Sequence, residues 1–508
     1  MAETPEKKIS LTGHALWILF AKTLAFMFSF ALPLLLVRRL DQREFGLYKQ
    51  VFLVVSTSVA LLPLGFAMSA FYFLPREPDK QQQVVFNILL FNAAVGLLAC
   101  VALVLRPSLL SVIFKSPEVA SHAPALGVCI MLWIVASFLE FIAIAHQEPK
   151  LATIFIVIAQ FTKTALLLAA ALVFGSVEWL IYAAIAQGVL QTIILCVYLQ
   201  ARFRGFWRGF EWAVMRRQLT YALPLGVAGM LYIVQMDLHN YVVAYHFDAD
   251  MYAVYAIGCF QLPLVQILSE SVGSVMIPRV SYLQRQGEHR EIIALTARAM
   301  RKLAAIFFPL YVLLLVVGRE FITFLYTEQY LPSVPIFIIN MTLLPFSIFV
   351  LDPVMRAYAE HRYFLLKVRP VLIAVLFVGL VYATGRFGLV ATISVMVGVT
   401  ILERLIMAFK VGRIVGVRRA DFALFKDIGK LAAVSVVAGV VTALVRSSVV
   451  GLHPAVVLVV CGCVFALVYA AGIYALEILS GEERQMIRGR IAQLQRRVHK
   501  VSTVDPLA

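Results

Sequence analysis

Long apolar segments, separated by short polar connections, follow one another along almost the whole chain. About fourteen occur, at residues 11–37, 48–73, 84–105, 124–144, 151–173, 179–199, 219–244, 253–277, 303–318, 334–355, 366–384, 388–409, 431–449 and 455–479. A run of about 18 or more apolar residues is long enough to cross a bilayer as a helix. The pattern therefore predicts an all-α polytopic membrane protein with about fourteen transmembrane helices. The ninth segment is the shortest and follows a charged amphipathic stretch.

The composition of the 508 residues supports this interpretation. Hydrophobic residues make up 62% of the chain and charged residues 14%, and the mean hydropathy is +0.90. A soluble protein of this size needs more polar surface, so a soluble fold is excluded. The polar residues 1–10 precede an apolar segment that is too long for the hydrophobic part of a signal peptide. We expect that segment to remain as a transmembrane helix.

Basic residues gather on one side of the predicted topology. With the N-terminus in the cytoplasm, 32 of the 44 Lys and Arg residues fall in cytoplasmic segments, 9 fall in outer segments and 3 lie within spans. Positive charge is enriched in cytoplasmic loops of membrane proteins, so both termini are predicted to be cytoplasmic. The net charge of +16 reflects this topology, and we expect no nucleic-acid partner.

Three short sequence stretches occur twice, in the same order. The pairs are "LDQREFGLY" (40–48) with "FDADMYAVY" (247–255), "FLPR" (73–76) with "MIPR" (276–279), and "LEFIAIAHQEPK" (139–150) with "LDPVMRAYAEHR" (351–362). Their offsets, between 203 and 212 residues, are nearly constant. The pattern indicates an internal duplication into two halves of six helices each, and both halves have the same orientation in the membrane.

The duplication predicts the domain organisation. Residues 1–200 and 219–410 form two six-helix lobes related by a pseudo-two-fold axis along the membrane normal. Residues 201–218 form a basic and aromatic linker, 411–480 add two helices outside the repeat, and 481–508 form a cytoplasmic tail. The tail has apolar residues at helical spacing among arginines, which is typical of an amphipathic helix on an anionic leaflet.

The first repeated stretch is interpreted as a structural hinge. It joins the first two helices of each lobe on the outer face, so two such hairpins facing each other would line the gap between the lobes. Asp41 and Asp248 precede a helix and are predicted to cap it, and Gly46 is predicted to allow close helix packing. Asp352 stands four residues before Arg356, at the spacing of a helical ion pair.

The layout of six, six and two segments resembles a known family. Together with "RRLDQREFGLYKQ" (38–50) and "MIPRVSYLQRQGEHREIIALTARAMRK" (276–302), it is similar to the Wzx-like oligosaccharide flippases of the polysaccharide transporter family. That family is part of the multidrug/oligosaccharidyl-lipid/polysaccharide (MOP) exporter superfamily. The resemblance covers nearly the whole chain, but the motifs are loose in residue identity, so no site transfers residue by residue.

The resemblance implies a V-shaped, two-lobed transporter that works by alternating access in the bacterial inner membrane. The implied substrate is a polyprenyl-diphosphate-linked glycan, turned from the cytoplasmic to the periplasmic leaflet for O-antigen, capsule or exopolysaccharide synthesis. The implied partners are this lipid-linked glycan, membrane lipids, and a polysaccharide polymerase and glycosyltransferases, with the protein itself a monomer. The resemblance also supports a positively charged central cavity.

Cations within the spans are candidates for contact with a diphosphate. His14 and Lys22 share one face of the first segment, and Lys163 lies near the middle of the fifth. Arg38 and Arg39 stand at the outer end of the first segment. Ionisable side chains within spans usually face a cavity or a partner. The alternatives are that each lysine pairs with an acid or carbonyl of a neighbouring helix and that the arginines meet lipid headgroups.

Acidic and histidine side chains in the seventh and eighth segments allow two interpretations. Asp237, His239 and Glu270 either bind a coupling ion, H⁺ or Na⁺, or form an internal salt bridge with Lys22. A membrane potential is a further possible driving force. No organic cofactor and no metal site are expected.

Motifs of common enzyme classes are missing from the sequence. It contains no Walker A loop, no glycine-rich dinucleotide turn, no zinc-ligand spacing and no large outer loop for a catalytic site. We therefore expect a transporter rather than an enzyme. Two alternatives stay open: a drug or small-cation exporter of the same superfamily, and a non-transporting membrane scaffold for glycan synthesis. The central lysines count against the drug exporter.

Overall fold

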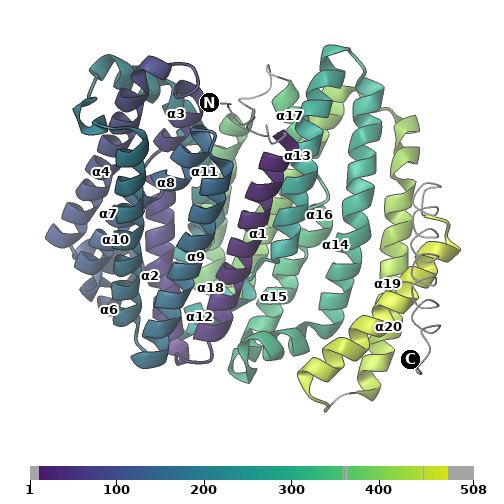
Figure 1. Ribbon diagram of the computed structural model, residues 1–508. Coiled ribbons are helices and arrows are strands. Elements are labelled where there is room, and N and C mark those ends of the chain that lie inside the picture. Colours follow the sequence, from purple (N-terminus) through teal and green to yellow (C-terminus); the bar gives the residue numbers. More distant parts are fainter. Residues whose placement is uncertain (1–10, 359, 361–363, 450, 479–508) are drawn as a thin grey trace, which may run out of the picture. The chain divides into compact units, whose positions relative to one another are not determined.

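The structure, a computed structural model, is helical throughout the part of the chain that it describes (Figure 1). It describes residues 11–358, 360, 364–449 and 451–478, with side chains from Thr23 onward except that of Phe26. No strand occurs within these ranges. The prediction of an all-α polytopic membrane protein is confirmed.

The first half of the chain contains the helices that correspond to the first six apolar segments. They are α1 (Leu11–Leu36), α2 (Gln42–Leu61), η1 (Phe66–Met68), α3 (Ser69–Phe73), η2 (Pro78–Lys80), α4 (Gln81–Leu105), α5 (Ser108–Phe114), α6 (Pro117–Ser121), α7 (Ala123–Ala136), α8 (Phe138–Ala145), α9 (Pro149–Val173) and α10 (Val177–Arg202).

The remaining helices follow after a short linker helix. They are η3 (Phe206–Arg208), α11 (Trp212–His246), α12 (Ala249–Gly258), α13 (Pro263–Arg285), α14 (His289–Tyr326), η4 (Glu328–Ser333), α15 (Val334–Met341), α16 (Leu343–Phe346), α17 (Asp352–Ala357), α18 (Phe364–Val415), η6 (Arg419–Phe425), α19 (Lys426–Ser448) and α20 (Pro454–Ala475).

The number of spans depends on how broken helices are counted. Ten helices of the described ranges are long and apolar enough to cross a membrane, and the number rises to twelve if each of two bent pairs is one span. The helix α1 covers the first predicted segment, and α18 contains two predicted segments. Each of the fourteen apolar segments therefore coincides with helical structure.

The helix α18 reverses direction at Gly388. This residue has φ 74° and ψ −161°, a conformation that is open to glycine because it has no Cβ. The hydroxyls of Thr384 and Thr392 lie 2.9 Å apart, and a Cβ added to Gly379 would lie 2.9 Å from a methyl group of Val395. In a straight helix, residues 379 and 395 would be about 24 Å apart. The two arms of α18 therefore form a helical hairpin, as two separate spans require.

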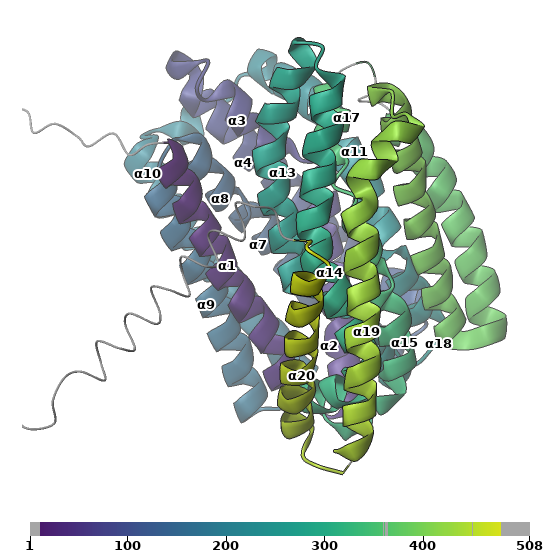
Figure 2. The ribbon, with the colours of Figure 1, turned by 90° about the vertical axis from the view of Figure 1, so that its right-hand side faces the viewer.

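Contacts divide the chain into two compact units. The first contains residues 1–267, 325–340 and 360–403, and the second contains residues 268–324, 341–359 and 404–508. In the first unit, α4, α7 and α10 lie side by side (Figure 1). In the second, α19 packs along α20 (Figure 2). The first unit includes helices from both repeat halves, so the units follow contacts rather than the repeat. The predicted division into lobes stays a prediction.

The second span of each repeat half is bent at a comparable place. The segments Gln42–Leu61 and Phe66–Phe73 meet at 42°, and Ala249–Gly258 and Pro263–Arg285 meet at 47°. A proline lies at each break, Pro63 in the first and Pro263 in the second. Proline lacks an N–H donor and clashes with the preceding turn, so it interrupts a helix. The duplicated sequence thus yields a duplicated backbone feature.

Candidate functional site

Two aspartates of the repeated hinge cap their helices with the same geometry. Asp41 precedes α2 with φ −68° and ψ 172°, and its Oδ1 accepts from the Glu44 N–H at 2.7 Å. Asp248 precedes α12 with φ −68° and ψ 174°, and its Oδ1 accepts from the Met251 N–H at 3.0 Å. An N-cap oxygen satisfies an N–H group that has no partner within the helix.

The helices that follow these caps pack directly against each other. A Cβ on Gly46 of α2 would lie 1.8 Å from the carbonyl oxygen of Ala249 at the start of α12. The Gln42 Nε2 donates to the Asp250 carbonyl oxygen at 3.1 Å. The two repeated helices are therefore in backbone contact near their N-termini, and only glycine fits at this point of α2.

A cavity of about 240 Å³ lies beside this contact. It is an open pocket lined by the end of α1, Lys49 of α2, the end of α12 with the chain that follows it, and one tyrosine at the end of α14. The lining residues are Ser29, Phe30, Pro33, Lys49, Ala256, Ile257, Cys259, Phe260, Gln261 and Tyr326. All of them belong to the first compact unit. The lining is largely apolar, with polar groups from a few side chains.

Lys49 is the cation of this cavity. Its Nζ lies 5.5 Å from the ring centre of Phe45 and 5.9 Å from that of Tyr48. No carboxylate pairs with it among the residues that the structure describes. Aromatic rings offer a cation only partial compensation for lost water. A half-buried ammonium group without an acid is suited to receive an anion. Lys49 stands at the start of the second predicted segment, 48–73, and is one of the nine basic residues counted on the predicted outer side.

Asp237 and His239 of α11 contact hydroxyl groups. The Thr57 hydroxyl of α2 donates to Asp237 Oδ2 at 3.0 Å, and Asp237 is half-buried. His239 is buried, and its Nδ1 lies 2.8 Å from the hydroxyl of the buried Tyr255. The acid therefore links α11 to α2, and the histidine links α11 to α12. Glu270 is exposed on α13.

Of the predicted cations whose side chains the structure describes, Lys163, Arg38 and Arg39 do not line this cavity. Lys163 of α9 places its Nζ 4.6 Å from the ring centre of Trp133 on α7, while Gln160 donates to Ser29 at 2.7 Å. Arg38 and Arg39 are exposed at the end of α1. His14 and Lys22 lie outside the residues whose side chains the structure describes, so their roles stay predictions.

An ion pair within the spans of the first unit was not among the predicted site residues. Arg369 Nε lies 3.3 Å from Glu403 Oε1, with side chains 16% and 12% exposed, so each arm of α18 contributes one partner. Gln235 of α11 donates to Glu403 Oε2 at 2.6 Å, and Arg369 lies 4.9 Å from the ring centre of Tyr232. Burial of both charges requires this mutual compensation. The pair and its neighbours join α11 to both arms of α18.

A family comparison identifies the group of proteins to which these features belong. The profile of the family described as "Polysaccharide biosynthesis protein" matches residues 35–335, more than half of the chain. The chain belongs to this family. The match includes the repeated hinge, Lys49, Thr57 and Asp237. No curated protein matches the sequence.

Solved structures show that this family member has the fold of MOP-superfamily transporters. The lipid II flippase MurJ in an inward closed conformation aligns with a TM-score of 0.68 at 13% identity, over 91% of this chain and 98% of that one. A MOP superfamily transporter from Pyrococcus furiosus aligns with a TM-score of 0.54 at 14% identity, over 81% of this chain and 95% of that one. The MATE transporter VcmN from Vibrio cholerae aligns with a TM-score of 0.56 at 12% identity, over 81% of this chain and 98% of that one. At such identities the likeness concerns the fold alone.

Proposed function

We propose that this protein is a flippase that moves a polyprenyl-diphosphate-linked oligosaccharide across the bacterial inner membrane by alternating access. Its product serves the synthesis of a surface polysaccharide. Family membership supports the pathway, and the fold shared with MurJ supports transport of a lipid-linked glycan. The distribution of basic residues predicts that both termini are cytoplasmic. The proposed direction, from the cytoplasmic to the outer leaflet, rests on the resemblance to oligosaccharide flippases.

Lys49 is the observation that carries this proposal. A diphosphate in a low-dielectric cavity costs several kcal/mol unless a cation compensates its charge. Lys49 offers such a charge in a cavity bounded by α1, α2 and α12, and no acid competes for it among the described side chains. Ammonium groups bind phosphate as point charges without a fixed orientation. That property suits a headgroup that has to enter and leave.

The contact between α2 and α12 is proposed as the outer gate of the alternating-access cycle. The hinge lies on the predicted outer face, and the close packing of Gly46 against Ala249 supports its proposed role as the outer gate. Opening on that side would require the two helices to separate at this contact. Lys22 and Lys163 are proposed as further cationic positions along the path. The glycosyltransferases and polymerase of the pathway remain proposed partners.

The location of trapped substrate tests the proposal in cells. Deleting the gene in the source organism should remove its surface polysaccharide and leave lipid-linked glycan in the cytoplasmic leaflet. Accessibility of the glycan to an impermeant sugar-modifying reagent in spheroplasts distinguishes the two leaflets. Normal surface polysaccharide in a deletion strain without a paralogue would refute the flippase function.

A drug exporter is the second candidate because of Asp237. Inward- and outward-facing multidrug MATE transporters share the fold, with TM-scores of 0.57 and 0.54. A half-buried carboxylate such as Asp237 suits a cationic substrate. Efflux of a cationic dye that depends on this protein and on Asp237 would favour the exporter. Lys49 opposes that role, because it would repel a cation in the cavity.

A further inference from the structure

Two linker segments expose large aromatic side chains together with arginines. The first, residues 204–212, includes η3 and exposes 50% of Trp207, 53% of Phe210 and 63% of Trp212. The second, residues 418–426, includes η6 and exposes 66% of Phe422. Each segment follows the last helix of one repeat half. Apolar groups exposed in this way at a linker indicate contact with another surface.

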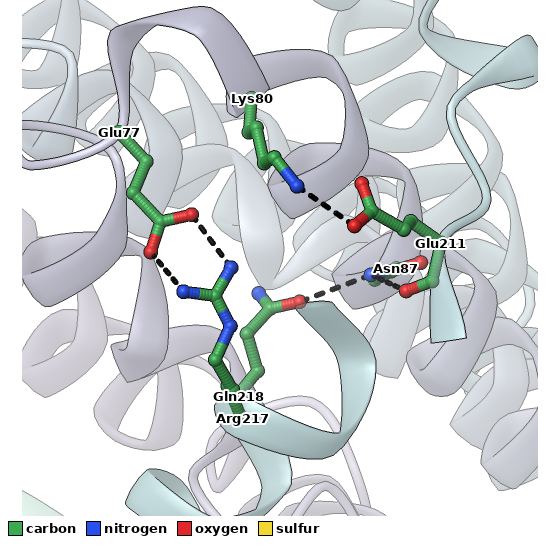
Figure 3. Close-up of polar contacts among 6 residues, drawn as sticks. All are labelled: Glu77, Lys80, Asn87, Glu211, Arg217 and Gln218. Atoms are coloured by element: carbon green, nitrogen blue, oxygen red, sulfur yellow. Dashed lines mark hydrogen bonds and ion pairs between the residues drawn. The ribbon is translucent and has the colours of Figure 1, made fainter. Parts of the chain in front are cut away.

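The first segment is held rigidly by the helices of its own half. Lys80 Nζ lies 2.7 Å from Glu211 Oε1, and Asn87 donates to the Glu211 carbonyl oxygen at 3.3 Å (Figure 3). Just beyond the segment, Arg217 donates to both carboxylate oxygens of Glu77 at 2.8 Å (Figure 3). Phe206 is buried. The segment that carries the exposed aromatic side chains is therefore fixed to neighbouring helices by polar contacts.

The second segment is held by an equivalent ion pair, whose two residues each lie the same number of positions after their counterparts in the first pair. Arg290 Nη1 lies 2.6 Å from Asp421 Oδ1, and Asp421 Oδ2 accepts from the Arg418 N–H at 2.7 Å. Lys80 and Arg290 are 210 residues apart, and so are Glu211 and Asp421. Each half of the duplication thus anchors the linker that follows it by a basic–acidic pair. The arrangement exists twice, each time with exposed aromatic and arginine side chains.

The arginines beside these aromatic side chains are available to an external anion. Arg204 and Arg208 in the first segment and Arg418 and Arg419 in the second are exposed, and none pairs with a carboxylate among the described residues. The planar guanidinium group donates two parallel hydrogen bonds to a phosphate. Tryptophan and phenylalanine side chains prefer the level where headgroups meet acyl chains. Both segments follow an even number of predicted spans and so lie on the predicted cytoplasmic side.

We propose that residues 204–212 and 418–426 are two binding sites for the phosphate headgroups of anionic phospholipids in the cytoplasmic leaflet. The arginines bind the phosphate, and the aromatic rings enter the interface beside it. This leaflet carries the anionic lipids that attract basic segments. The two sites hold the end of each repeat half at a fixed depth in the membrane. The proposal does not depend on the transported substrate.

Retention of lipid by the purified full-length protein tests this proposal. Native mass spectrometry would count the phosphatidylglycerol molecules bound to each protein and, in separate samples, the phosphatidylcholine molecules. The proteins are the wild type and two linker variants, Arg204→Gln/Arg208→Gln and Arg418→Gln/Arg419→Gln. A matched control, Arg106→Gln/Arg386→Gln, removes two exposed arginines from predicted outer ends of spans. An arginine near an anionic surface contributes about fivefold to binding, so the altered site of each linker variant should bind phosphatidylglycerol about 25-fold more weakly while the other site keeps its lipid. Phosphatidylcholine binding and the control should not change.

A second variant separates headgroup binding from net charge. Trp207→Gln/Trp212→Gln keeps every charge and should also weaken phosphatidylglycerol retention. Elution volume and thermal unfolding in zwitterionic detergent verify the fold, and the single variants Arg204→Gln and Arg418→Gln, each with about a fivefold loss expected at its site, replace a double variant that fails to fold. Unchanged phosphatidylglycerol retention in both linker variants, or an equal loss in the control, would overturn the proposal. Loss of a co-purifying protein with intact lipid retention would assign these segments to protein docking instead.

Discussion

Lys49 stands in the cavity with aromatic rings as its neighbours. If it compensates a diphosphate, Lys49→Ala removes a charge-assisted contact worth about 1.5–3 kcal/mol. Transport should then fall by about ten- to hundredfold, while Lys49→Arg should retain part of it because the charge remains. Surface polysaccharide, measured beside the amount of protein in the membrane, gives the readout. Full export by Lys49→Ala would show that this side chain does not meet the substrate.

The Arg369–Glu403 pair is expected to act on stability. Arg369→Leu leaves the Glu403 carboxylate buried without compensation, which typically costs about 3–5 kcal/mol. The double variant Arg369→Leu/Glu403→Leu should recover most of that loss, because no charge remains to be compensated. Thermal unfolding of the purified variants measures both effects. A double variant as unstable as the single one would mean that Gln235 and Tyr232, rather than the pair, determine stability here.

Single residues were predictable from the sequence where local rules decide them. Asp41 and Asp248 precede helices and act as caps, and Asp352 lies 2.6 Å from Arg356 at the helical spacing. The place of Lys49 in the cavity could not be predicted, because the cavity forms only where α1, α2 and α12 come together. Arg369 lies 34 residues from Glu403, and only the hairpin at Gly388 brings them together. Such pairings depend on tertiary packing rather than on spacing.

At the scale of helices, the contact between α2 and α12 depends on the absence of a side chain at Gly46. Gly46→Ala places a Cβ 1.8 Å from a backbone oxygen, so the helices have to move apart. We expect the free energy of unfolding to fall by about 1–3 kcal/mol and transport to fall markedly. Gly229→Ala in α11 is the control, since its Cβ meets nothing within 4 Å. Comparable unfolding temperatures for the two variants would contradict this account of the contact.

A cross-link between the same helices tests whether they separate during transport. Gln42→Cys and Asp250→Cys, introduced into a background without the native cysteines, would be joined by a short reducible cross-linker. The Gln42 side chain already reaches the Asp250 backbone at 3.1 Å, so the bridge should not distort the fold. Cross-linking should abolish transport and reduction should restore it. Normal export by the cross-linked protein would favour the scaffold function.

Helices were the level at which the sequence was most informative. Every apolar segment coincides with one or more helices, because a backbone in lipid has to satisfy its hydrogen bonds within the segment. The repeated stretch 40–48 and 247–255 also predicted two equivalent hinges. The bends of 42° and 47° were not predicted, although Pro63 and Pro263 mark their positions. The cavity between the hinge helices was not predictable, because it requires the contact of α2 with α12.

At the scale of the whole molecule, the duplication and the compact units describe different properties. The repeat explains the matched caps, bends and linker ion pairs of the two halves. The contact-based units combine α2 of the first half with α12 of the second, because these helices meet at Gly46. Family membership and the shared fold agree with the resemblance seen in the sequence. The identity of the glycan and the coupling ion depend on side chains that vary within one fold.

Transbilayer movement of a labelled substrate tests the central claim most directly. Purified protein would be reconstituted into vesicles that contain a fluorescent polyprenyl-diphosphate oligosaccharide, and an impermeant reagent would report how much of it reaches the outer leaflet. The account predicts that all of the labelled lipid becomes accessible with active protein. In vesicles with the cross-linked variant, or at early times with Lys49→Ala, the reagent should modify only the labelled lipid that was in the outer leaflet at the start. Equal accessibility in vesicles with and without the protein would contradict the proposed function.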